Sequence, residues 1–178
     1  MSLPFTHPAK FICTWFGSGL SPKAPGTAGS LAALPFGYVI HSTWGQNGLL
    51  VASLVAFFVG WVATNIYLKH TESKDPKEVV IDEVAGQWFL LSFFYPTWES
   101  YIVGFAMFRF FDVLKPWPIS WADRKVKGGL GVMLDDMLAG FLPFVAAGLL
   151  IILGKLSGTE IEFTGFMHFM GMPDHVQW

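Results

Sequence analysis

The sequence has few charged side chains and a single cysteine. Asp, Glu, Lys and Arg together make up 13% of the 178 residues, about half the fraction typical of soluble domains. Hydrophobic residues make up 53%, and the mean hydropathy is +0.49. The lone Cys13 excludes an internal disulfide and a multi-cysteine metal site, and a formal charge of −2 leaves no general basic surface for nucleic acid. This composition predicts that most of the protein surface contacts lipid.

Several catalytic signatures are also absent. The thiol phosphatase spacing requires an arginine six positions after the cysteine, but position 19 is Gly. Asp112 is followed by Val-Leu, so the Asp-x-Asp motif of haloacid dehalogenases is missing. The five histidines are scattered and form no triad or zinc spacing. Gly128, Gly129 and Gly131 match no phosphate-binding loop, and we expect them to supply flexibility. Carboxylates with a metal ion remain as the plausible catalytic groups.

Long uncharged runs predict membrane-spanning helices. No charged residue occurs from position 24 to 68, a run of 45 residues. Polar and turn-forming residues at 41–48 divide this run into segments 30–40 and 49–68. About 20 apolar residues cover the hydrocarbon core, so the second segment can cross unaided, whereas the first is short and contains Pro35.

Three further apolar runs follow, at 84–95, 101–111 and 137–154. None shows the polar stripe at helical period that a soluble helix needs. The predicted fold is therefore an all-α, polytopic membrane bundle with four to five spans and an interfacial active site. We expect one membrane domain at 1–155, followed by a tail at 156–178 whose apolar spacing is compatible with an interfacial helix.

The basic residues indicate the orientation of the bundle. With the N-terminus inside, ten of the eleven Lys and Arg residues fall on the cytoplasmic side and only Lys155 falls outside. The positive-inside rule makes this a strong bias. The sequence therefore predicts a multi-pass membrane protein whose charged helix ends face the cytoplasm.

The same helix ends carry most of the carboxylates. They are Asp82 and Glu83 before the third run, Asp112 after the fourth, and Asp135 and Asp136 before the last. Oxygen ligands gathered at one depth are what Mg²⁺ prefers, with water and substrate phosphate completing its shell. The alternative is that each acid only caps a helix start and complements the helix dipole. For either acidic pair taken alone, helix capping and metal binding have about equal weight. The presence of all five acids at one face of the membrane favours a metal site.

Possible phosphate donors lie beside these acids. Arg109 and Lys115 flank Asp112 on one helical face, and an arginine fork and a lysine ammonium both suit phosphate. Arg124 lies in a basic segment with Lys125 and Lys127, which could instead rest on anionic lipid. Thr27 and Ser30 lie at the start of the first apolar run, where they could bind phosphate at a helix N-terminus or form only a turn and cap.

Several long, ordered blocks resemble bacterial phosphatidylglycerophosphatase A. They are residues 17–22 (GSGLSP), 25–33 (PGTAGSLAA), Asp82-Glu83 with Gly86, 108–119 (FRFFDVLKPWPI), Asp123-Arg124, 128–131 (GGLG) and 135–140 (DDMLAG). The resemblance covers roughly residues 11–155.

The resemblance implies a Mg²⁺-dependent phosphomonoesterase that converts phosphatidylglycerophosphate to phosphatidylglycerol and inorganic phosphate. The expected metal ligands are Asp82, Glu83, Asp135 and Asp136, and the expected catalytic residues are Asp112, Asp135 and Asp136. Thr27, Ser30, Arg109, Lys115 and Arg124 are expected to bind the substrate. Activated water and a covalent aspartyl-phosphate both remain open as routes.

Two other classes of function remain as alternatives. A small transporter would place ionisable residues near the midplane, in paired broken helices. A non-catalytic lipid-binding subunit would need basic and aromatic residues but not the acidic pairs. The partner is expected to be a phospholipid rather than a nucleic acid, and no pattern indicates the oligomeric state.

Overall fold

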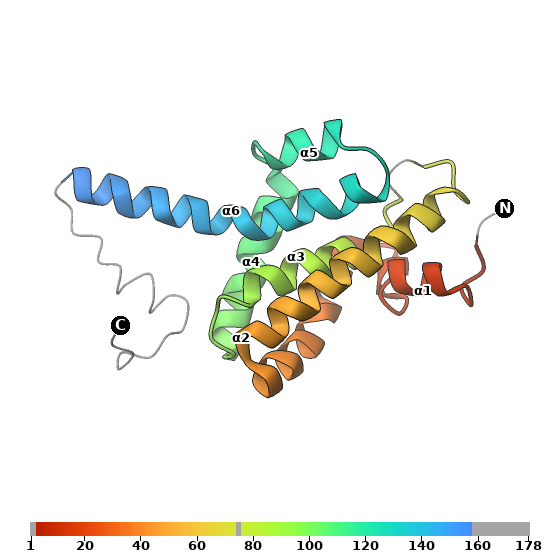
Figure 1. Ribbon diagram of the computed structural model, residues 1–178, viewed down its shortest axis with the longest axis horizontal. Helices are drawn as coiled ribbons and strands as arrows, with labels where there is room; N and C mark the ends of the chain where they lie inside the picture. The colour runs from red at the N-terminus through yellow and green to blue at the C-terminus, as the bar shows by residue number, and fades with distance from the viewer. Residues whose placement is uncertain (1–2, 74–75, 158–178) are drawn as a thin grey trace.

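The computed structural model describes residues 3–73 and 76–157, and these residues form helices with no strand. The all-helical prediction is confirmed. The interfacial helix predicted in the tail falls on positions from 158 onward, which lie outside the described residues. In chain order the elements are α1 (Pro8–Cys13), the short 3-10 helix η1 (Ser18–Leu20), α2 (Pro25–Leu68), α3 (Ile81–Leu91), α4 (Trp98–Leu114), α5 (Ile119–Lys125) and α6 (Gly128–Leu156) (Figure 1).

The long α2 consists of two helices joined at Gly45. This residue has φ 68° and ψ −170°, a conformation that only glycine adopts readily. The predicted break at 41–48 is therefore confirmed. The first half is longer than the predicted segment 30–40, because Pro25 stands at the first turn, where its fixed φ and missing N–H suit a helix start. At about 1.5 Å per residue, each half is about 30 Å long.

Within residues 3–73 and 76–157, two helical segments are long and apolar enough to cross a membrane, Pro25–Leu68 and Gly128–Gly154. Large apolar side chains cover their outer surface and that of α4, including Val39, Phe58, Ile102 and Leu150, each more than half exposed. This surface suits lipid. By contrast, α3 has 11 residues and would cover only about half of the hydrocarbon core. The expected four to five spans therefore stay a prediction.

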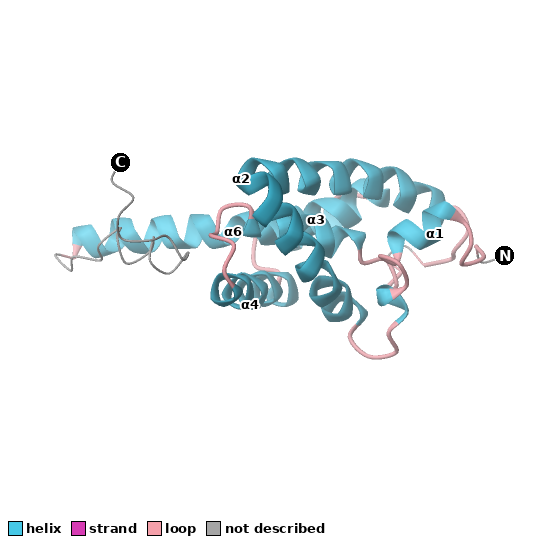
Figure 2. Cartoon of the chain, turned by 90° about the horizontal axis from the view of Figure 1, so that it is seen from below, coloured by secondary structure: helices cyan, strands magenta, loops and turns pink. Residues whose placement is uncertain are grey.

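Helix α3 is the buried centre of the bundle, packed against α2, α4 and α6 (Figures 1 and 2). The indole N–H of Trp88 donates to the carbonyl of Ala33 at 2.9 Å, and the hydroxyl of Ser53 donates to the carbonyl of Ala85 at 2.8 Å. These bonds join α3 to both halves of α2. They hold the middle of α3 against α2.

Small residues let α3 and α6 cross with their backbones in contact. A Cβ at Gly86 would lie 2.4 Å from the carbonyl oxygen of Asp136, and a Cβ at Gly140 would lie 2.5 Å from that of Gly86. Both distances are far below a normal contact. Any larger residue at either position would therefore push the two helices apart.

The structure corrects the predicted start of the last helix. Gly128, Gly129 and Gly131 belong to the first turn of α6 and are not a flexible linker. A Cβ at Gly129 would lie 2.8 Å from the Trp61 carbonyl oxygen, and the Gly129 N–H donates to Oδ1 of Asn65 at 2.9 Å. Asp135 and Asp136 consequently lie about two turns inside α6 and do not open it. The glycines serve close packing against the end of α2.

The candidate active site

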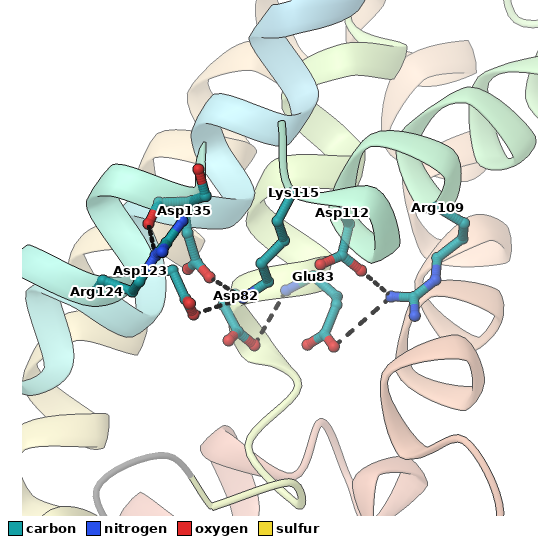
Figure 3. A network of polar contacts seen from close by, with 9 residues as sticks. Asp82, Glu83, Arg109, Asp112, Lys115, Asp123, Arg124 and Asp135 are labelled. Carbon is teal, nitrogen blue, oxygen red and sulfur yellow. Dashed lines mark hydrogen bonds and ion pairs between the residues drawn. The ribbon is translucent and has the colours of Figure 1, made fainter. Parts of the chain in front are cut away.

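A cavity of about 910 Å³ opens at one end of the bundle. The chain direction explains its place, because the end of α2, the start of α3, the end of α4 and the start of α6 all meet there. Figure 3 shows acids and bases from α3, α4, α5 and α6 gathered together. The charged side chains lining it include Asp82, Glu83, Arg109, Asp112, Lys115, Asp123, Arg124, Asp135 and Asp136.

Three carboxylates form the centre of this site. Asp82 and Glu83 from α3 and Asp136 from α6 each offer an oxygen within 4.8 Å of the other two. At Mg²⁺–oxygen distances of about 2.1 Å, octahedral ligands lie about 3 to 4 Å apart, so small side-chain shifts would suffice. Oε2 of Glu83 and Oδ1 of Asp135 are buried and have no hydrogen-bond partner among the described residues. The donor set fits a hard divalent cation.

Burial makes the charged form of these acids unfavourable without a cation. It raises the pKa of the Asp82 carboxyl well above its ordinary value, and the neighbouring carboxylates of Glu83 and Asp136 raise it further. Burial likewise raises the pKa of Glu83 to about 7, although hydrogen bonding to Asp82 and the charge of Arg109 lower it. A bound divalent cation would offset this repulsion.

Helix capping does not account for the whole cluster. Asp82 and Glu83 do lie in the first turn of α3, where Oδ1 of Asp82 accepts the Glu83 N–H at 3.1 Å. Asp136, however, lies inside α6, where no helix terminus needs an acid. Asp112 lies in the last turn of α4, where the helix dipole disfavours a negative charge. Capping therefore does not explain the positions of Asp112 and Asp136.

Arg109 neutralises one side of the cluster. Its guanidinium forms an ion pair with Asp112 one turn later on α4, and its Nη1 lies 3.8 Å from Oε1 of Glu83. Gly26, in the first turn of α2, lies against both side chains, because a Cβ there would be 2.1 Å from Oε1 of Glu83 and 3.2 Å from Nη1 of Arg109. Sequence reasoning did not single out Gly26. Its role is visible only when α2 and α3 are packed together.

Lys115 neutralises the other side. It ends α4 in the left-handed conformation, with φ 43° and ψ 53°, which turns its side chain back over the cavity. Its Nζ lies 2.7 Å from Oδ1 of Asp123 and 2.6 Å from Oδ2 of Asp135 (Figure 3). Burial alone would lower the pKa of Lys115, but these two carboxylates raise it above its ordinary value. The lysine therefore stays charged and keeps one N–H donor free for a ligand.

Asp123 is the site residue that the candidate list from the sequence omitted. Its only signal was its place in the Asp123-Arg124 block of the resemblance. Arg124 lines the cavity as expected, and its Nε donates to the carbonyl of Ser120 at 2.9 Å.

Thr27 and Ser30 do not line the cavity, whereas Pro25 and Gly26 just before them do. The hydroxyl of Ser30 is fully buried and donates to the Gly26 carbonyl at 2.9 Å. In the described structure Ser30 supports the start of α2. A direct role for Thr27 and Ser30 in substrate binding stays a prediction.

Comparisons with known proteins show the family of the chain. The family model described as phosphatidylglycerophosphatase A matches residues 11–153. The phosphatidylglycerophosphatase A of Escherichia coli is 40% identical over 159 residues, covering 85% of this chain and 87% of that protein. The protein of the same name from Haemophilus influenzae is 36% identical over 134 residues, covering 75% and 82%. No solved structure gives a significant match.

A third relative carries a different name. A Bacteroides thetaiotaomicron protein, provisionally named a phosphatidylinositol-3-phosphatase, is 39% identical over 142 residues, covering 75% of this chain and 87% of that protein. Relatives that are similarly identical to this chain are thus named after different lipid phosphates.

Proposed function

Because the chain belongs to the phosphatidylglycerophosphatase A family, we propose that it hydrolyses the terminal phosphomonoester of phosphatidylglycerophosphate. The products are phosphatidylglycerol and inorganic phosphate, which places the reaction in phospholipid biosynthesis. The observation that carries the proposal is the cluster of Asp82, Glu83 and Asp136 flanked by the cations Arg109 and Lys115. Acids that hold a metal and cations that bind phosphate are the groups that phosphomonoester hydrolysis needs.

Asp82, Glu83 and Asp136 would hold Mg²⁺, and the unpartnered Oδ1 of Asp135 is available as a further ligand. When bound, the ion would neutralise charge on the phosphoryl oxygens and lower the pKa of a nearby water.

The other side chains would act on substrate and water. Asp112, beside Asp136 and Arg109, would orient the attacking water and accept its proton. The water oxygen bonds to phosphorus, the bond from phosphorus to the glycerol oxygen breaks, and that oxygen gains a proton. Arg109, Lys115 and Arg124 would donate to the phosphoryl oxygens as negative charge builds on them, a contribution of about several kcal/mol.

The membrane explains why the site lies at one end of the bundle. The phosphate of a lipid stays in the headgroup layer, so the catalytic groups must lie at that depth. We propose a multi-pass protein of the bacterial inner membrane with this end toward the cytoplasm. The apolar outer surface of α2 and α6 and the basic residues near the cavity support that orientation.

The test is phosphate release by the purified protein from phosphatidylglycerophosphate in mixed micelles. Activity should disappear with chelator and return with Mg²⁺. Asp136→Asn should lower kcat at least a hundredfold and weaken activation by Mg²⁺. Glu99→Gln is the matched control, because Glu99 is an exposed acid at the opposite end of α4, and it should behave like the wild type.

A substrate panel separates the related functions. Phosphatidylinositol 3-phosphate belongs in it because of the name of the Bacteroides relative. Faster release from that lipid would move the proposal to another lipid phosphate. No release from any lipid phosphate, with or without Mg²⁺, would reject hydrolysis and favour the transporter or lipid-binding alternatives.

A further inference from the structure

Gln87 is a buried amide without a hydrogen bond. It lies in α3, has no exposed surface, and neither its Nε2 nor its Oε1 has a partner within the part of the chain that the structure describes. Native proteins satisfy most buried polar atoms, so an amide with both atoms unpartnered needs an explanation. An apolar side chain would suit this position better if Gln87 only filled space.

The helix directs Gln87 toward the carboxylate cluster. Gln87 follows Glu83 by four residues in α3, so the two side chains lie on the same face, one turn apart. Side chains in helices point back toward the N-terminus. The amide therefore extends toward Glu83, and pairs of polar side chains at this spacing are close enough to hydrogen-bond.

Two site residues, Glu83 and Arg109, carry unpartnered atoms whose donor and acceptor roles complement those of Gln87. Oε2 of Glu83 is a buried acceptor without a partner, and Nε of Arg109 is a buried donor without one, again counting only described residues. Glu83 and Arg109 are neighbours, with Oε1 and Nη1 3.8 Å apart. Gln87 has one group of each opposite kind, a donating NH₂ and an accepting carbonyl. Two hydrogen bonds would therefore satisfy the Gln87 oxygen, one of its N–H groups, Oε2 of Glu83 and Nε of Arg109.

We propose that Gln87 is a positioning residue of this site, whose amide bridges Glu83 and Arg109 in the metal-bound protein. Its NH₂ donates to Oε2 of Glu83, and its oxygen accepts from Nε of Arg109. The bridge requires the side chain of Gln87 to rotate, and its terminal torsion is a soft one.

The bridge acts through the two residues that it holds. It fixes the Glu83 carboxylate for the metal and leaves the terminal N–H groups of Arg109 for the phosphate. Residues that orient metal ligands in this way commonly affect metal affinity or activity 10- to 100-fold, roughly. The inference rests on the proposed function, so its test includes a measurement that does not depend on turnover.

The experiment compares Gln87→Met, which keeps the side-chain volume and removes the amide, with Gln87→Leu as a second apolar variant. Melting temperature in detergent is measured during a Mg²⁺ titration, and kcat and KM are measured separately. Both variants should melt at or above the wild-type temperature without metal, because a buried unpartnered amide has been removed. The Mg²⁺ midpoint of stabilisation should rise about 10- to 100-fold, and kcat should fall with little change in KM.

Ser53→Ala is the matched control. Ser53 is also buried and polar, but its hydroxyl is satisfied by the Ala85 carbonyl outside the cavity. This variant should melt lower while the Mg²⁺ midpoint and kcat stay unchanged.

Three results would overturn the role of Gln87. They are an unchanged Mg²⁺ midpoint and kcat in both apolar variants, a loss of melting temperature in step with activity, and a wild-type protein that Mg²⁺ does not stabilise. Stabilisation of the wild type by Mg²⁺ without phosphate release would instead reject the proposed function. The midpoint shift would still decide the role of Gln87.

Discussion

Replacing Gly86 with alanine tests whether the crossing of α3 and α6 sets the geometry of the metal site. A Cβ at this position would lie 2.4 Å from the carbonyl oxygen of Asp136. Carbon and oxygen atoms in close contact normally lie about 3.3–3.6 Å apart, so the helices must separate by about 1 Å. Neither atom can rotate away, because the clash involves a Cβ and a backbone carbonyl.

The separation should weaken both the fold and the site. Overpacking of this kind typically lowers the free energy of unfolding by about 1–3 kcal/mol. Asp82 and Glu83 move with α3 while Asp136 moves with α6, so the same 1 Å enters the ligand distances directly. A misplacement of that size can lower activity about a hundredfold. We expect Gly86→Ala to lower kcat by one to two orders of magnitude and to raise the Mg²⁺ concentration needed for half-maximal activity.

The assay is phosphate release in mixed micelles over a Mg²⁺ titration, together with thermal melting in the same detergent. Gly148→Ala is the matched control, because a Cβ there meets no atom within 4 Å although the residue belongs to the same α6. The control should leave kcat and melting temperature unchanged or slightly raised. Wild-type kcat and Mg²⁺ response in Gly86→Ala would show that the close crossing does not position the carboxylates.

Three other substitutions test separate parts of the structure. Burial raises the pKa of Glu83 from 4.5 to about 7, so without metal the folded chain keeps a proton that the unfolded chain releases. The melting temperature in chelator should then fall as pH rises from about 4.5 to about 7, and Glu83→Gln should flatten this decline; a pH-independent melting temperature in the wild type would contradict the burial argument. Lys115→Met leaves Asp123 and Asp135 without their shared cation. The free energy of unfolding should fall by about 1–3 kcal/mol and kcat by at least about tenfold. Chemical denaturation measures the first and phosphate release the second, and unchanged values would remove Lys115 from the site. Asn65→Leu removes the acceptor of the Gly129 N–H, so the free energy of unfolding should fall by about 1 kcal/mol, whereas an unchanged denaturation midpoint would show that this bond does not hold the start of α6.

Local chemistry accounts for what could be predicted about the fold. The absence of charge over positions 24–68 and the turn-forming residues at 41–48 predicted two helices, and Gly45 is where they join. The start of α6 could not be predicted in the same way. Its glycines are poor helix formers, and they are helical because α6 packs backbone-close to Trp61 and Asn65. A helix start that depends on a distant neighbour leaves no clear local signal.

The sequence predicted which acids gather at one end of the bundle but not which side chains they pair with. Asp82, Glu83, Asp112, Asp135 and Asp136 were all expected at one end of the bundle, and all line the cavity. Thr27 and Ser30 were also expected to bind substrate, but they do not line the cavity, whereas Asp123, which was not among the candidates, does. Side-chain direction around a helix depends on its rotation against its neighbours, and that rotation is set by packing.

The amino-acid sequence by itself determined the helical class, the apolar surface, the break in α2 and the family, because these follow from residue types and their order along the chain. The tertiary structure alone decided which carboxylates share a site, which of them pair with Arg109 or Lys115, and that the buried Gln87 has no hydrogen-bond partner among the described residues. The physical reason is that these relations depend on distances between helices. Contacts such as that between Gly86 and Asp136, 50 positions apart in the chain, set those distances.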